Sequence, residues 1–246
     1  MTRMIIPAAG RGTRLKAEVP KLLFEVNGKS LIQHVMSRHA PYVTSFILVI
    51  HPDMEDAVAK HLQDSPWSFE LAFQSSATGM LDAILLATDL FTQYGDEHVS
   101  ISWCDQIGIS DTTSKRMHHE VSRLGEFGMV MPTVTKPEPY IHLERASDGR
   151  ICRILQRREG DNMPRVGEND CGLFALTRKT YLEWLPEFSR SVENGSTTRE
   201  RNFLPFIPWL SQRATVKTSE IENKSDSVRI NTREEADALS KEISSI

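Results

Sequence analysis

Cysteine is scarce in this sequence, and its cysteines are far apart. Cys104, Cys152 and Cys171 are odd in number and scattered through 246 residues. Disulfide frameworks and zinc sites both need cysteines at recurring close spacings, so the sequence predicts neither. Unpaired cysteines are typical of a reducing compartment, and we therefore expect a cytoplasmic location.

Long apolar runs and an excess of basic residues are also missing. No stretch approaches the ~20 apolar residues of a membrane span, and the short apolar start at Met4–Ile6 leads into a glycine loop rather than a signal-peptide cleavage site. The formal net charge is −4 at pH 7. We expect no membrane partner and no nucleic-acid partner held by a broad basic face, while a local basic pocket remains compatible with this charge.

The eight histidines have no metal-ligand spacing, and no Ser-His-Asp or Cys-His arrangement is apparent. His118 and His119 lie on a predicted polar helix, where adjacent residues do not share a face. We interpret both as surface residues.

Strand and helix patterns alternate in the first half of the chain. A continuous apolar run predicts a buried strand at 46–50, and further strands are predicted at 69–74 and 99–103. Helices are predicted after Ser30, near 54–62 and, from helical periodicity, over 80–91. This order favours a parallel α/β sheet. After Gly128 the chain is richer in strands, predicted at 129–135, 142–146, 151–156 and 170–176, with helices returning at 179–187, 203–210 and 233–243. We predict a single domain, 1–246, with two lobes, about 1–128 and about 129–246.

The most informative stretch runs from Met4 to Leu15 and is followed by Pro20-Lys21. An apolar strand ends there in small residues, which allow a ligand to approach the backbone and leave amide groups free to face an anion. Arg11, Arg14 and Lys21 add full positive charges. Two glycines alone are equally compatible with a plain strand-to-helix turn, but the loop with its cations suits a polyphosphate.

Three motifs together resemble the signature of the sugar-phosphate nucleotidyltransferases, within the MobA-like, GT-A-like NTP transferases. They are Gly12-Thr13-Arg14, Pro20-Lys21 and the run 22–29. In motif order, the likeness is strongest to the uridylyltransferase domain that handles N-acetylglucosamine 1-phosphate. It is dense from Ile5 to Val35 and thinner as far as Leu239.

The resemblance implies a three-layer α/β/α Rossmann-like fold, with a mostly parallel central sheet and an added antiparallel, substrate-facing portion. The first lobe would bind the nucleotide and the second the acceptor. No β-helix repeats follow, so a second, acyltransferase activity is not expected.

The same resemblance implies a magnesium-dependent reaction. A nucleoside triphosphate and a phosphorylated sugar would give an NDP-sugar and pyrophosphate, with Arg14 and Lys21 as the catalytic cations. The implied nucleotide-binding residues lie in the first loop and in the turn after the third strand: Ala8, Ala9, Gly10, Arg11, Gly12, Thr13, Gln74, Thr78 and Gly79. That turn has an extra residue, and Ala77 stands where a glycine is usual.

Two distant residues are candidates for the Mg²⁺ site. Asp105 follows a buried strand at the carboxyl edge of the predicted sheet, where such sheets bind ligands, and Asn231 lies in a late segment that resembles the family's second metal-binding position. Oxygen ligands of this kind suit Mg²⁺. Helix-cap or turn roles are the competing interpretation for both. We interpret Asp226 as surface charge, able to approach the ion.

The acceptor positions depart from the resembling uridylyltransferase. They fall at Ile141, Gln156, Asp170 and Cys171, and all four differ from the residues usual there. We therefore expect Gln156, Asp170 and Cys171 to bind a different phosphorylated sugar or small alcohol.

Other functions stay open at this point. One is a cytidylyltransferase that acts on a polyol-type or choline-type phosphate or phosphonate, and another is a non-catalytic nucleotide-binding module. A dinucleotide-binding oxidoreductase is disfavoured, because a third glycine is missing after Gly10-Arg11-Gly12 and His51, not an acidic residue, follows the second strand.

Overall fold

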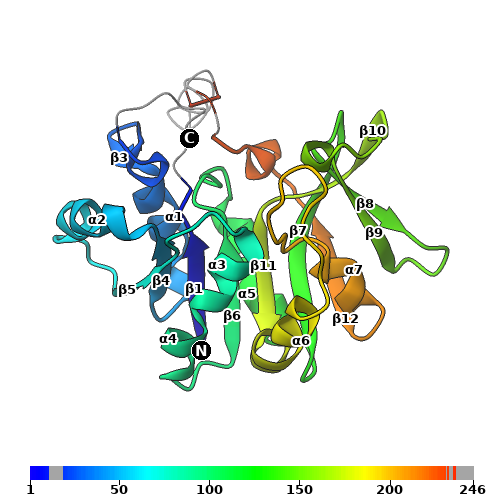
Figure 1. Ribbon diagram of the computed structural model, residues 1–246, viewed down its shortest axis with the longest axis horizontal. Coiled ribbons are helices and arrows are strands. Elements are labelled where there is room, and N and C mark those ends of the chain that lie inside the picture. The colour runs from blue at the N-terminus through cyan, green and yellow to red at the C-terminus, as the bar shows by residue number, and fades with distance from the viewer. Residues whose placement is uncertain (11–18, 231, 233–234, 237–246) are drawn as a thin grey trace.

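A computed structural model of the chain describes residues 1–10, 19–230, 232 and 235–236 (Figure 1). The strands of its central sheet are β1 (Thr2–Pro7), β4 (Phe46–Ile50), β5 (Phe69–Phe73), β6 (His98–Ser102), β7 (Gly128–Pro137), β10 (Val166–Asp170), β11 (Leu173–Thr177) and β12 (Thr215–Glu220). They follow the order β10-β7-β11-β6-β1-β4-β5, and β12 pairs with β7. β1, β4, β5 and β6 pair in parallel, whereas β11 and β10 introduce antiparallel pairings.

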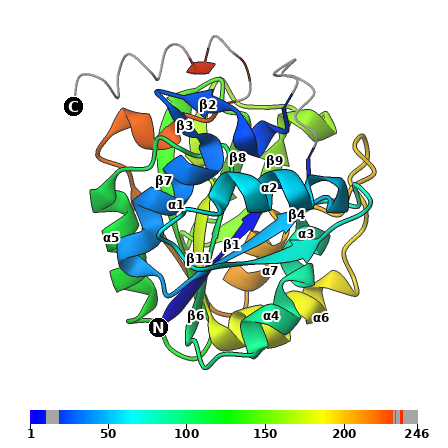
Figure 2. The same ribbon diagram turned by 90° about the vertical axis from the view of Figure 1, so that its left-hand side faces the viewer.

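Helices cover both faces of this sheet. One face carries α1 (Leu31–His39), α2 (Glu55–Leu62) and α5 (Asp111–Val121); the other carries α3 (Met80–Leu86), α4 (Thr88–Thr92), α6 (Leu185–Ser189) and α7 (Phe206–Ser211). Figure 2 shows α1 and α5 on one side of the strands and α3, α4, α6 and α7 on the other. Each face of the sheet packs against helices in a separate apolar cluster, so the central strands carry apolar side chains on both faces. The three-layer α/β/α fold is thus confirmed. In the described part of the chain, no helix has the length and apolar character needed to span a membrane.

Two small hairpins stand outside the main sheet. In the first, β2 (Glu25–Val26) and β3 (Lys29–Ser30) are joined by Asn27 and Gly28, both at positive φ, as a two-residue hairpin loop requires. Ser30 then caps α1 in a capping box with Gln33, as the sequence predicts. The second, β8 (Ile141–Arg145) with β9 (Ile151–Gln156), extends from the far end of the sheet.

The predicted strand 170–176 is wrong as a single element. β10 ends at Asp170 and β11 starts at Leu173, because Gly172 at φ +73° turns the chain between them. β12 was not predicted at all. Its residues are polar and partly exposed, so its sequence lacks the apolar run of a buried strand. The predicted helix 233–243 lies almost wholly outside the described residues.

The interpretation of His118 as a surface residue is also wrong, although His119 is exposed as expected. His118 lies in the interface between α1 and α5, stacked on Tyr42 with ring centroids 5.5 Å apart and edge-on to the buried His39. Neither of its ring nitrogens has a hydrogen-bond partner among the described residues. Burial lowers the pKa of His118 to about 4 and lowers that of His39 well below its usual value.

This interface should make the fold sensitive to acid. The folded state holds His118 neutral, while the unfolded chain takes up a proton below its ordinary pKa of 6.5. The free energy of unfolding should therefore fall as the pH decreases from about 6.5 toward 4, by about 2 kcal/mol at pH 5. Urea unfolding of the parent and of His118→Phe at pH 7.5 and 5.0 checks this, since the phenyl ring keeps the stacking and cannot titrate. His119→Phe is the matched control; an equal acid sensitivity in all three proteins would contradict the assignment.

Candidate active site

Two adjoining cavities open at the carboxyl ends of the parallel strands. A smaller one of about 350 Å³ reaches toward β4 and β5, and a larger one of about 780 Å³ extends toward the β8–β9 hairpin. Both are lined by Pro7, Gly10, Met80 and Arg158. Open α/β sheets bind their ligands at this edge, and two joined cavities of this size leave room for two ligands side by side.

Lys21 and Asp105 form an ion pair on the wall of the larger cavity. Lys21 begins a single 3₁₀ turn, which the buried Leu22 anchors in the core, and Asp105 follows the end of β6. The Nζ–Oδ2 distance is 2.5 Å, and the two side chains are only 14% and 15% exposed. The structure therefore brings together two residues that the sequence analysis assigned separately, from positions 84 apart in the chain.

Asp105 also has the chemistry of a single cation ligand. Its second oxygen, Oδ1, is buried and has no hydrogen-bond partner among the described residues, and an orphaned carboxylate oxygen is a donor that Mg²⁺ prefers. No cluster of three or more His, Cys, Asp and Glu side chains occurs in the described ranges, so a magnesium ion here would need amide, phosphate or water oxygens as well. The neighbouring Cys104 is no candidate nucleophile, because burial and the Asp105 charge raise its thiol pKa to about 12.

The late segment of the chain runs beside Asp105. The backbone N–H of Ile230 donates to the carbonyl oxygen of Asp105 at 3.1 Å. Asn231, the predicted second metal ligand, is the next residue and lies outside the described residues, as do Arg11, Gly12, Thr13 and Arg14.

Asp226 is not the surface charge that the sequence suggested. It is fully buried, and its carboxylate accepts hydrogen bonds from the backbone and hydroxyl of Ser110 and from the hydroxyl of Thr113, at the start of α5. Gln106 donates to its backbone carbonyl at 2.6 Å. These hydrogen bonds of Asp226 therefore hold the late segment of the chain against the loop that carries Asp105.

The smaller cavity is built around the turn that follows β5. Gln74 is buried, and its amide nitrogen donates to Thr78 Oγ1 at 3.1 Å and to the carbonyl oxygen of Gly79 at 3.0 Å. Gln74 and Gly79 line the cavity together with Ala9 and Gly10, whereas Ala8 lines the larger cavity. Gln74 thus holds the turn in shape, and the backbone of the turn faces the cavity.

Gln156, which the sequence analysis assigned to the acceptor, lines the larger cavity together with Asn169, Asn202, Lys136 and Arg229, which it did not assign. Asn202 donates to Gln156 Oε1, while Asn169 Oδ1 accepts the backbone N–H of Ile141 at 2.9 Å. Ile141 itself lines the cavity. Lys136 and Arg229 complete this wall. Asn169 stands next to Asp170, so the sequence reasoning missed it by one position, and nothing in the sequence around Asn202 indicated a role.

Asp170 and Cys171 lie behind the cavity wall. Cys171 is buried in the apolar cluster beneath α1 and α5. Asp170 is also buried; it accepts from Gly172 N–H at 2.8 Å and pairs with the guanidinium of Arg229 at 2.5 Å. The absence of a Cβ on Gly172 leaves room for Arg229 and Trp103. Arg229, rather than Asp170, reaches the cavity.

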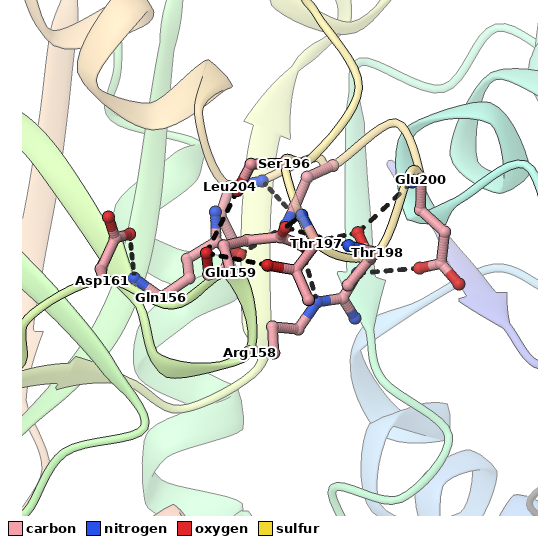
Figure 3. Close-up of polar contacts among 10 residues, drawn as sticks. Gln156, Arg158, Glu159, Asp161, Ser196, Thr197, Thr198, Glu200 and Leu204 are labelled. Carbon is pink, nitrogen blue, oxygen red and sulfur yellow. Dashed lines mark hydrogen bonds and ion pairs between the residues drawn. The ribbon is translucent and has the colours of Figure 1, made fainter.

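One segment, Ser196–Leu204, lines both cavities, through Glu200 in the smaller one and through Asn202 and Leu204 in the larger one. Figure 3 shows polar contacts of this segment. Its first part rests on Glu159, whose carboxylate accepts the backbone N–H groups of Thr197 and Thr198 and the Thr198 hydroxyl. Burial alone would raise the pKa of Glu159, but these hydrogen bonds outweigh it and lower the pKa. Glu200 then pairs with Arg158 at 2.8 Å, and Asn202 reaches Gln156.

The same segment closes over the turn of the smaller cavity. Arg201 donates its N–H to the carbonyl oxygen of Thr78 and accepts from Leu81. A Cβ on Gly79 would lie 2.2 Å from the Arg201 carbonyl oxygen, and Gly79 has φ +120°. Only glycine fits there.

Comparison with known proteins gives the following similarities. Residues 4–167 match the family model described as the MobA-like NTP transferase domain. Bifunctional protein GlmU of Buchnera aphidicola subsp. Schizaphis graminum is 21% identical over 240 residues, covering 97% of this chain and 50% of that protein. GlmU of Chromohalobacter salexigens is 27% identical over 193 residues, covering 78% and 41%. The chain spans half or less of the length of these relatives.

Among solved structures, the fold is similar to that of a Bacillus anthracis protein provisionally described as a glucose-1-phosphate thymidylyltransferase and crystallised with sucrose. The TM-score is 0.76, the sequence identity is 18%, and the match covers 98% of this chain and 96% of that one. At this identity the similarity concerns the fold alone.

Proposed function

The chain belongs to the MobA-like NTP transferase family, and on that premise we propose that it is a magnesium-dependent nucleotidyltransferase. It would join a nucleoside triphosphate to a phosphorylated sugar or small alcohol and release pyrophosphate. The observation that carries this proposal is the buried Lys21–Asp105 pair on the wall of the larger of two adjoining cavities. The free reduced cysteines fit the cytoplasmic location that we propose with it.

The two cavities suit the two substrates. The base and ribose would occupy the smaller cavity, against the backbone of the Gln74–Gly79 turn, and the acceptor would occupy the larger one, between Ile141, Gln156 and Asn202. Lys21 lies on the wall of the acceptor cavity, so the triphosphate from one side and the acceptor phosphate from the other would meet beside it.

The transfer needs positioning and charge neutralisation rather than a covalent intermediate. An oxygen of the acceptor phosphate would attack the α-phosphorus while the bond to pyrophosphate breaks, and a phosphate that is already ionised needs no strong base. Lys21 would offset the charge that builds on the α-phosphate, together with Arg14, which we assign by family resemblance. Asp105, with Asn231, would hold Mg²⁺, which when bound would neutralise the phosphate oxygens.

A non-sugar acceptor is the second candidate, and Ile141 favours it. This apolar side chain lines the acceptor cavity and fills space beside Gln156. A polyol-type phosphate or a phosphonate, activated with CTP, needs less space beside Gln156 than a hexosamine does.

We expect N-acetylglucosamine 1-phosphate to be a poor acceptor, because Ile141 narrows the cavity and the amide of Gln156 is already paired with Asn202. A mismatch with a fixed hydrogen-bond pattern in a buried site should lower kcat/KM by about 100-fold or more. Pyrophosphate release from UTP, CTP, GTP and dTTP, measured with sugar 1-phosphates, polyol phosphates and phosphonates, tests both this expectation and the proposed function.

The result separates the possibilities. Release with one acceptor well above the others identifies the natural class. Efficient turnover of N-acetylglucosamine 1-phosphate with UTP, above every other pair, contradicts the acceptor assignment only. Triphosphate binding without release for any acceptor would favour the non-catalytic module.

A further inference from the structure

The larger cavity has an uneven distribution of charge. Four described cations line it: Lys21, Lys136, Arg158 and Arg229. Three of them have a carboxylate partner, since Lys21 pairs with Asp105, Arg158 with Glu200 and Arg229 with Asp170. The side chain of Lys136 makes no hydrogen bond or ion pair with any residue that the structure describes.

Lys136 is also partly withdrawn from water. It is half-buried near the end of β7, and burial together with the neighbouring charge of Arg229 lowers its pKa. Withdrawing an ammonium group from water without a partner costs free energy. An anion bound in the cavity would offset that cost, because a lysine ammonium is a compact charge with three donors.

The position of Lys136 separates it from the reaction centre. Asp170, the partner of Arg229, pairs with Thr133 in the β7–β10 register, whereas Lys136 pairs with Gly167, three residues further along β7. Three residues of extended strand span about 10 Å. Asp170 is in turn joined to the end of β6, because Trp103 N–H donates to the Gly172 carbonyl two residues before Asp105. The backbone of Lys136 thus lies further along β7 than the position opposite Asp170, and its charge interacts with both Arg229 and Asp170.

We propose that Lys136 binds a second anionic group on the acceptor, a carboxylate or a phosphate, in addition to the phosphate that reacts. The inference rests on the proposed function, in that the acceptor occupies the larger cavity. The reacting phosphate must lie beside Lys21 and Asp105, and Lys136, whose backbone lies further along β7, would face the opposite end of the same ligand. An acceptor without a second anionic group would leave this charge uncompensated, so the preferred acceptors are small phosphorylated acids or bisphosphates.

Pairs of acceptors that differ in one anionic group test the proposal. The pairs are glucose 1-phosphate with glucuronic acid 1-phosphate, glycerol 3-phosphate with 3-phosphoglycerate, and glucose 1-phosphate with glucose 1,6-bisphosphate. Binding of each is measured by calorimetry with magnesium, with and without an α,β-methylene triphosphate, to the parent, Lys136→Gln, Lys136→Met and Lys136→Arg. Lys115→Gln, at an exposed position of α5, is the matched control.

The parent and Lys115→Gln should bind the more charged member of at least one pair about tenfold more tightly. Comparing the carboxylate pairs with the bisphosphate pair shows whether the second anionic group is a carboxylate or a phosphate. Lys136→Gln and Lys136→Met should lose this preference with no change for the member that has a single anionic group, and Lys136→Arg should keep it. No preference in the parent, no acceptor binding at all, or a preference that survives in Lys136→Gln overturns the proposal. A preference without pyrophosphate release would refute the proposed function and leave the second-anion site standing.

Discussion

Asp105→Asn should reduce nucleotidyl transfer by about 1,000-fold or more at low magnesium, with little recovery at high magnesium. The substitution keeps the size and one oxygen of the side chain, but it removes the charge that a hard divalent cation requires. It also leaves the ammonium of Lys21 without the carboxylate that lies 2.5 Å away. The measurement is the initial rate of pyrophosphate release over a magnesium titration.

Two comparisons make this prediction specific. Asp111→Asn, at the exposed start of α5, removes a carboxylate that accepts a hydrogen bond from the Tyr42 hydroxyl at 2.8 Å, and it should leave the rate and the magnesium dependence unchanged. Full activity of the parent in the presence of a chelator would contradict the metal assignment itself.

Lys21→Ala should lower kcat by about 100-fold to 1,000-fold, a larger effect than its effect on stability. Lys21 would act on charge that develops in the transition state, so its loss should reduce kcat more than it weakens triphosphate binding. Single-turnover rates, triphosphate binding by calorimetry and urea unfolding give the three quantities separately. Lys29→Ala is the control, because Lys29 is an exposed lysine of the adjacent hairpin. Unchanged binding and full activity in Lys21→Ala would show that the role of Lys21 is wrong.

Combining the two substitutions gives a further check on the pair. Because Lys21 and Asp105 share an ion pair, their effects should not add. The double variant should transfer the nucleotidyl group at about the rate of the slower of the two single variants.

The sequence predicted the parallel half of the fold well because that half obeys local rules. β1, β4 and β6 are largely buried on both faces, and β4 is a continuous apolar run. The residues that end these strands fall at one edge of the sheet. Lys21 and Asp105 could be assigned from sequence for this reason, although no local pattern indicates that they touch. β12, which is polar and partly exposed, has no such pattern.

The acceptor side was harder to predict because its geometry depends on contacts across the fold. The turn at Gly172 rotates Asp170 and Cys171 away from the cavity and leaves Asn169 and Arg229 on its wall. Asp226 has the composition of a surface residue, and its burial depends on Ser110 and Thr113, more than 110 positions away. Long-range polar partners of this kind leave no periodic signal.

The segment Ser196–Leu204 has a consequence for how such an enzyme changes over evolution or in the laboratory. It fits the Gly79 turn through the backbone of Arg201 and reaches Gln156 through Asn202, the next residue in the chain. A graft that replaces the 74–79 turn with that of a relative would displace this segment and, with it, Gln156. With the base assigned to the turn and the acceptor to Gln156, as we propose, a productive chimera would therefore have to exchange the turn and the segment together.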